Sequence, residues 1–179
     1  MRLKLMLVML VVLLVVGGVV GAAVPSIFEA GLVSSYTIEA LADTEFATYS
    51  PAVRLGFYVN EWFGISGEAL LVSPFSESSD TYRFLLSTDL VFRWPLGFFE
   101  PYLGIGPTYD VQITSGDFSF MEKILYSARV GFDFNITPVL ALGVEANHII
   151  PDLPNLLASP ENFDLMANTH IGLVVKAKL

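Results

Sequence analysis

The strongest constraint on the fold is an alternation of apolar and polar residues with a period of two. In the final stretch THIGLVVKAKL every second residue from Ile171 to Leu179 is apolar, and the alternate positions, which start at His170, include Lys176 and Lys178. A period of two is the repeat of a β-strand, whose side chains point alternately to its two faces. The chain is therefore predicted to end on a strand with one apolar face and one charged face.

The same alternation recurs along most of the chain. It predicts eight strands, in residues 27–37, 49–60, 62–73, 81–94, 101–113, 122–135, 139–150 and 162–179. Three connections are short or moderate (60–62, 95–100 and 136–138), and they alternate with longer, more polar ones. A meander with short turns at one rim and long loops at the other is typical of an up-and-down barrel. We therefore predict an all-β fold, an eight-stranded antiparallel up-and-down barrel.

Composition indicates which face points outward. Hydrophobic residues make up 54% of the chain and charged residues only 15%, a poor supply for a water-exposed surface. Large aromatic residues lie near the predicted strand ends, and strands of about 11 residues suit a tilted bilayer crossing. We predict a transmembrane β-barrel with its apolar face outward. The alternative is a soluble, lipocalin-like periplasmic carrier, which would have its apolar face inward.

The first residues have the pattern of a signal peptide. Arg2 and Lys4 precede an uncharged run over 5–24, with small residues before a predicted cleavage after Ala23. We expect residues 1–23 to be a signal peptide and 24–179 to form the barrel, with an uncleaved membrane anchor as the alternative. Without cysteine, disulfides and a lipoprotein anchor are excluded. The mature chain would carry a formal charge of −11, with seven bases and eighteen acids, which disfavours nucleic acid as a partner.

The strand count, the alternation of loop lengths, the stretch EPYLGIGPTY and an ending on the last strand resemble the small eight-stranded outer-membrane barrels of the OmpA and OmpX type. The resemblance covers residues 24–179. It implies a location in the bacterial outer membrane after export, contact with membrane lipid, and no periplasmic domain. It says little about activity, because fold does not determine function.

Charged residues collect on the face that would point inward. They are Glu29, Glu68, Asp89, Asp110, Asp133, Glu145, Asp164, Arg54, Arg83, Arg93, Arg129, Lys176 and Lys178, and His170 falls on the same face. Seven acids and six bases are close to balance. Inside a narrow barrel these ions must be paired, because an unpaired buried ion costs several kcal/mol.

Turn positions predict partners for some of these charges. A turn centred on Glu61 would place Arg54 opposite Glu68. A turn centred on Thr137 would place Arg129 opposite Glu145, and closure of the barrel would bring Glu29 toward Lys176. Side chains nearly fill an eight-stranded interior, so the network is expected to plug and rigidify the barrel. A narrow, transient conducting path is the alternative.

The sequence predicts no catalytic, metal or cofactor site. Motifs for zinc, nucleotide phosphates and dinucleotides are absent from it. His148 falls on the outward face near the loop rim, where a rim-acting lipid-modifying enzyme would need a base beside a nucleophile and an acid. His148 has no Ser on the same face of its strand, and we expect a protein that is not an enzyme.

The long connections are candidates for external contacts. They cover 38–48, 74–80, 114–121 and 151–161, and they are rich in acids, which favours solvation, with weak divalent-cation contact as an alternative. The connection over 151–161 is more apolar and is expected to cover the barrel mouth or touch the membrane surface. We expect a monomer with a structural or surface-interaction role that contacts an extracellular ligand or an envelope protein through these loops.

Overall fold

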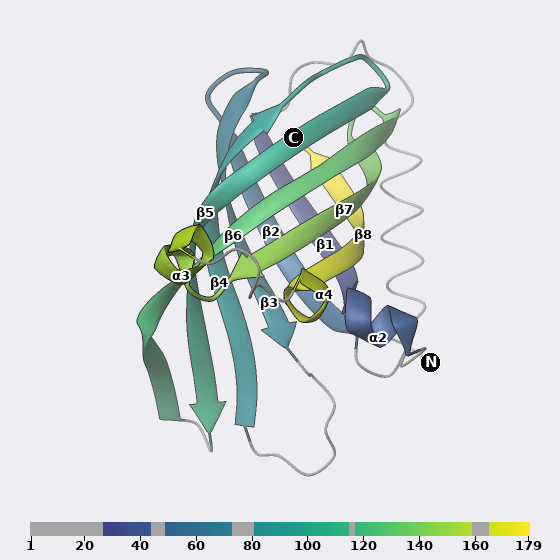
Figure 1. Ribbon diagram of the computed structural model, residues 1–179. Helices are drawn as coiled ribbons and strands as arrows, with labels where there is room; N and C mark the ends of the chain where they lie inside the picture. Colours follow the sequence, from purple (N-terminus) through teal and green to yellow (C-terminus); the bar gives the residue numbers. More distant parts are fainter. Residues whose placement is uncertain (1–26, 44–48, 73–80, 115–116, 159–164) are drawn as a thin grey trace.

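The fold is a closed barrel, seen in a computed structural model that describes residues 27–43, 49–72, 81–114, 117–158 and 165–179 (Figure 1). The predicted leader 1–23, the loop 74–80 and Asp164 lie outside these residues. Each strand pairs antiparallel with its sequence neighbour, and β1 closes on β8. The strands are β1 (Phe28–Thr37), β2 (Ser50–Tyr58), β3 (Phe63–Val72), β4 (Thr81–Arg93), β5 (Phe99–Thr114), β6 (Asp117–Thr137), β7 (Leu140–Ile150) and β8 (Thr169–Lys178). The predicted all-β, eight-stranded up-and-down barrel is confirmed.

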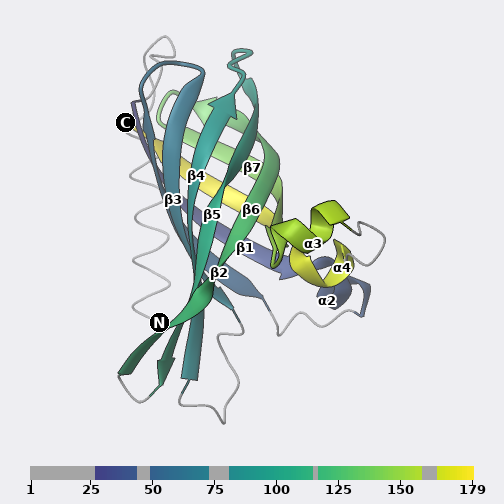
Figure 2. The same ribbon diagram turned by 60° about the vertical axis from the view of Figure 1, so that its left-hand side comes forward.

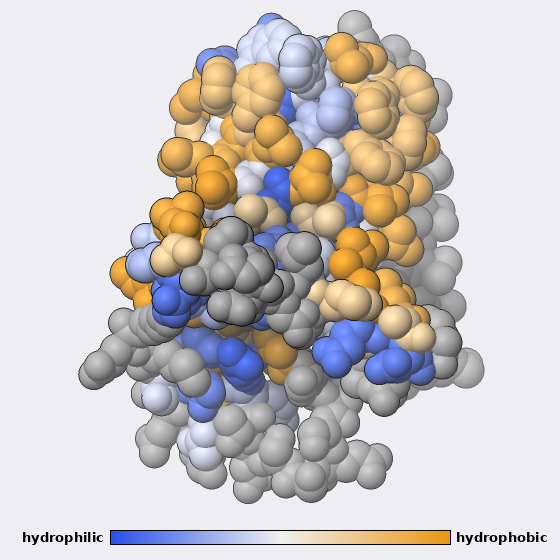
Figure 3. All heavy atoms as spheres, viewed as in Figure 1, coloured by the Kyte–Doolittle hydropathy of each residue, from blue (hydrophilic) through white to orange (hydrophobic). Residues whose placement is uncertain are grey.

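The two faces of each strand have opposite exposure. On β2, Leu55 and Phe57 are 52% and 55% exposed, whereas Arg54, which precedes Leu55 and points to the other face, is 5% exposed. The same alternation continues to β8, where Leu173 is exposed and Val174 is buried. Apolar side chains therefore point outward and ions inward, the opposite of a soluble carrier. Figure 3 shows apolar side chains gathered over the strands.

Aromatic side chains ring the end of the short turns, which lies at the top of Figure 1. Trp62 and Trp94 pack against each other and against Phe92, with ring centroids 5.8 to 6.2 Å apart. At the other end Tyr36 and Tyr49 pair at 6.5 Å. Aromatic residues at both ends of an apolar wall are typical of a transmembrane barrel, whose rings lie at the two membrane interfaces.

The β5–β6 hairpin is longer than predicted. Pairing continues from Tyr109↔Ile124, across an irregularity, to Thr114↔Asp117, so most of the predicted loop 114–121 is strand. The hairpin and the start of β4 reach beyond the helices at the loop end (Figures 1 and 2). The same irregularity turns Val111, which has the parity of the exposed Tyr109, to a buried position 4% exposed. Leu140, which has the parity of the exposed Leu142, is 7% exposed beside the irregularity at the β6–β7 turn.

Three short helices replace parts of the predicted loops and of the last strand. They are α2 (Ile38–Ala42), α3 (Leu153–Ala158) and α4 (Leu165–Asn168). The Thr37 hydroxyl caps α2 by accepting from the Ala40 amide at 3.1 Å. The prediction that the eighth strand begins at residue 162 is wrong, because 165–168 are helical and pairing begins at Thr169. In the part of the chain that the structure describes, no helix is long and apolar enough to cross a bilayer.

Candidate functional site in the barrel interior and at the loop rim

A central ion network crosses the middle of the barrel. Arg54 bonds Glu68 from the neighbouring strand and Glu145 from the opposite wall, with Nη2 2.6 Å from Glu145 Oε1. The Arg129 Nη2 atom lies 3.1 Å from Glu68 Oε1 and 2.8 Å from Asp89 Oδ2. All five residues are at most 6% exposed. Each buried ion thus has an opposite charge in contact, and the network joins β2, β3, β4, β6 and β7.

A second network lies nearer the short turns. Arg93 Nη1 is 2.5 Å from Glu29 Oε1, and its guanidinium lies 3.7 Å from the centre of the Tyr58 ring. Lys178 Nζ is 3.0 Å from Glu100 Oε1 and 3.7 Å from Glu29 Oε1. The network therefore ties β1 to β8 at the seam where the barrel closes, and to β4 and β5 across the interior.

Lys176 and Tyr102 extend the central network. The Lys176 Nζ atom is 2.6 Å from Asp133 Oδ2 and 3.9 Å from the centre of the Tyr102 ring. The Tyr102 hydroxyl donates to Glu145 Oε2 at 2.7 Å. These contacts place an aromatic ring across the interior between the two sets of ions.

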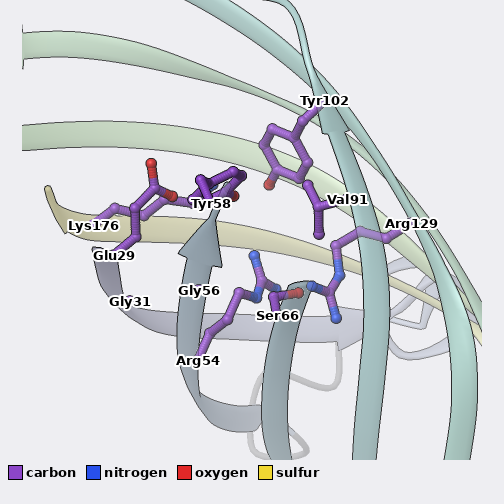
Figure 4. A pocket seen from close by; sticks show the side chains of 10 residues that line it. All are labelled: Glu29, Gly31, Arg54, Gly56, Tyr58, Ser66, Val91, Tyr102, Arg129 and Lys176. Carbon is purple, nitrogen blue, oxygen red and sulfur yellow. The ribbon is translucent and has the colours of Figure 1, made fainter. Parts of the chain in front are cut away.

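The interior holds little free space among these groups. A gap of about 10 Å³, roughly the room of one water molecule, is lined by Arg54, Ser66, Arg129 and neighbouring residues. Figure 4 shows the guanidinium groups of Arg54 and Arg129 directed toward each other beside Ser66. An eight-stranded barrel filled in this way has no room for a wide pore.

An apolar layer lies on the loop side of the central network. Its members share the inward face with the ions, and they are Val33, Ala52, Leu70, Leu85, Ile149 and Val174, with Val72 and Leu125 packed against them. Val174 is 1% exposed. The interior is thus layered, with ions toward the short turns and in the middle, and apolar packing toward the loops.

The loop rim carries two polar contacts. Arg83, predicted inward, has a side chain that is 46% exposed, and its Nη2 lies 2.5 Å from the buried Asp110. On the outward face His148 Nδ1 lies 2.7 Å from Thr169 Oγ1, and the two residues are cross-strand partners. His170, which follows Thr169, points inward and is 6% exposed.

The described side chains contain no cluster of three or more His, Asp or Glu arranged to hold a metal.

The structure tests the three predicted pairs. Arg54 lies opposite Glu68, as predicted. The pairing of Arg129 with Glu145 is wrong, because an irregularity between Asn135 and Thr137 moves the register and places Asn147 opposite Arg129. The Arg129 Nε atom and Glu145 Oε2 still approach to 4.0 Å.

The third predicted pair, between β1 and β8, is wrong by two residues. Glu29 lies opposite Lys178, whereas Gly31 lies opposite Lys176. Backbone hydrogen bonds between Phe28 and Leu179, at 3.2 and 2.8 Å, fix this register at the seam. Lys176 is therefore free to reach Asp133 on β6.

One interior ion and the apolar layer are absent from the predicted interior. Glu100 was assigned to the connection 95–100, but β5 begins at Phe99 and points Glu100 inward, 6% exposed. Its parity with Tyr102 and Gly104 along the strand was the available signal. The apolar layer was missed because its residues are hydrophobic on the face that was read as polar. Their positions near the loop ends of successive strands were the signal for it.

Several solved structures share this fold, although their sequences are at most 15% identical to this chain. The N-terminal β-barrel domain of Pseudomonas aeruginosa OprF is 10% identical with a TM-score of 0.59, covering 85% of this chain and 96% of that chain. A de novo designed transmembrane β-barrel is 14% identical with a TM-score of 0.57, covering 89% of this chain and all of that chain. Neisserial surface protein A is 15% identical with a TM-score of 0.49, covering 85% and 94%. No protein-family model and no curated protein sequence matches the chain. The likeness shows a shared fold, the small transmembrane barrel.

Proposed function

We propose that the chain is an integral protein of the bacterial outer membrane, not an enzyme, which holds a protruding sheet at the cell surface for contact with other molecules. The apolar outward wall and the aromatic residues at both rims support a bilayer location. The likeness in fold to the OprF barrel supports the outer membrane as that bilayer. The chain acts as a monomer, surrounded by membrane lipid.

The free edge of β6 carries the surface-interaction role. β6 pairs with β7 only from Tyr126 onward, whereas Asp117–Phe120, Ile124 and Leu125 pair with β5 on one side. Among the described residues, no strand pairs with the other side of Asp117–Leu125. An exposed strand edge presents unpaired N–H and C=O groups that an extended segment of another protein can bind as an added strand. Its position beyond the helices of the rim makes it accessible (Figure 2).

The closed interior supports an anchoring role over a transport role. Two ion networks and an apolar layer fill successive levels of the barrel. An opening of the barrel would break these ion pairs and leave buried charges without a partner, at a cost in free energy. The barrel therefore acts as a rigid support for the sheet and for the loops.

Site-specific photo-crosslinking in cells tests the proposal. A photoreactive residue at Ser119, on the free edge, is expected to give discrete protein adducts, whereas one at Leu173, on the outward wall of β8, is expected to give lipid adducts. A shortened hairpin, in which Val111–Glu122 are replaced by an Asn-Gly turn, keeps the Tyr109–Ile124 pair. A competition experiment with an excess of the unlabelled shortened protein should leave the Ser119 adducts intact, since it lacks the edge. Equal adduct patterns at Ser119 and Leu173 would contradict the surface role.

A rim-acting lipid-modifying enzyme remains a second candidate because of one contact. His148 beside the Thr169 hydroxyl supplies a base next to a potential nucleophile. The preferred proposal expects His148→Gln to leave the acyl composition of outer-membrane lipids unchanged, as measured by mass spectrometry. The disappearance of an acyl-modified lipid from cells with this variant would favour the enzyme.

A further inference from the structure

A groove crosses the outward wall on the side of β3 to β7. It has a volume of about 900 Å³, and its lining is mostly apolar, with Arg129 on β6 and His148 at the loop end as its polar residues. Five of its residues form one cross-strand row, each paired with the next: Ile65, Leu90, Ile105, Ala128 and His148. Ala128 is the smallest of the five, so the wall is hollowed where β6 crosses the row. We call this feature the wall groove.

The wall groove has the length and slope of one lipid chain. Neighbouring strands lie about 4.8 Å apart, so a row over five strands is about 19 Å long. Because the strands are tilted by about 40°, the row climbs from the short-turn side at Ile65 to the loop side at His148. It rises about half of the roughly 25 Å height of an outer-membrane barrel's apolar band. A linear hydrocarbon chain fits such a path.

One end of the wall groove is polar. His148 lines the wall groove at its loop end and is hydrogen-bonded to Thr169, which is 9% exposed. Their neighbours along the strands, Ala146 and Ile171, are apolar. Both lie near the loop ends of β7 and β8, close to the expected membrane interface. A polar pair at this height matches the depth at which the ester and glycerol groups of a lipid begin.

We propose that the wall groove binds one acyl chain of a membrane lipid, with the polar end of that lipid at His148. The inference rests on the membrane location proposed above, and it does not require catalysis. A second copy of the barrel is the less favourable occupant, because its broad wall would span the groove and leave a narrow path along the row unfilled.

Photolabelling in vesicles tests this site. The protein is reconstituted in phosphatidylethanolamine vesicles that contain a little phosphatidylcholine with a diazirine in one acyl chain. Label is expected to concentrate on peptides that contain Ile105 and Ala128, in preference to the wall formed by β1 and β8. Ala128→Phe fills the wall groove and should lower that labelling several-fold. Ala30→Phe is the matched control, because Ala30 is an outward alanine on β1.

The outcomes separate this site from the membrane location itself. Folding of each variant is checked by heat-modifiable gel migration, and Ala128→Leu serves if the phenylalanine variant does not fold. Label spread evenly over all outward faces, or labelling that Ala128→Phe leaves unchanged, would overturn the wall groove but leave the membrane location standing. A crosslinked dimer through β5 and β6 would also overturn it. Failure of every outward face to take up label would contradict the membrane location.

Discussion

Individual ionic residues of the interior contribute unequally to the stability of the barrel. Arg54 contacts two buried carboxylates, whereas Arg83 contacts one carboxylate from a half-exposed position at the rim. A buried ion pair adds little net stability, but removal of one partner leaves the other charge uncompensated in a low-dielectric interior. The effect of a substitution therefore depends on depth more than on the number of contacts.

Arg54→Ala should lower the free energy of unfolding by about 3 to 5 kcal/mol, because Glu68 and Glu145 lose their shared partner. Arg83→Ala, the control, should cost less, because Arg83 lies half exposed at the rim and its removal lets water reach the Asp110 carboxylate. Urea unfolding of the protein in phospholipid vesicles measures both. Equal losses for the two variants would contradict a buried central network.

Residue partners were predictable only where the turn between their strands is regular. Arg54 and Glu68 flank a short turn, and their pairing follows from its centre. Arg129 was assigned the wrong partner because no residue type in ITP announces an irregularity between Asn135 and Thr137. The partner of Glu29 depended on the closure register, which joins the most distant parts of the chain.

At the scale of elements, the β5–β6 hairpin departs most from expectation. The polar run TSGD marks a turn, and the turn does lie there, between Thr114 and Asp117. The predicted loop was extended past this turn to residue 121, although Asp117, Phe118, Ser119 and Phe120 keep a period of two. Pairing with β5, which itself pairs with β4 up to Thr81, continues through these residues.

Hydrogen exchange should divide β6 into two parts. Amides of residues 126–134 lie between β5 and β7 and should exchange slowly. In residues 117–125, those amides that face away from β5 should exchange much faster, because they lack a strand partner among the described residues. Amide exchange measured by NMR in micelles resolves both parts. Uniform protection from 117 to 134 would mean that the edge is covered.

At the scale of the whole molecule, the period-two alternation and the loop lengths predicted the strand number and the topology, and composition predicted the orientation of the wall. The layering of the interior was not predictable, because alternation distinguishes two faces but not levels along the barrel axis. The apolar layer around Leu70 and Val174 and the ions around Arg54 share one face. Their separation appears only when strand register is known.

A filled interior predicts electrical silence. The native protein should show no stable conductance in planar bilayers, because ions, Tyr102 and the apolar layer block successive levels. Tyr102→Ala removes the ring between the two networks and should produce brief openings. Tyr109→Ala, on the outward face of the same strand, should remain silent. Steady conductance of the native protein would contradict a plugged barrel.

Orientation of the wall is tested most directly with single nitroxide labels, which a chain without cysteine allows at any chosen site. Labels at Leu55, Phe132 and Leu173, in protein reconstituted into vesicles, are predicted to collide often with oxygen and rarely with a water-soluble nickel chelate. Labels at Ser66 and Ser127 in the interior should be shielded from both reagents. If Leu55 and Leu173 are instead shielded from oxygen, or are reached freely by the nickel chelate, the wall does not face lipid and the account fails.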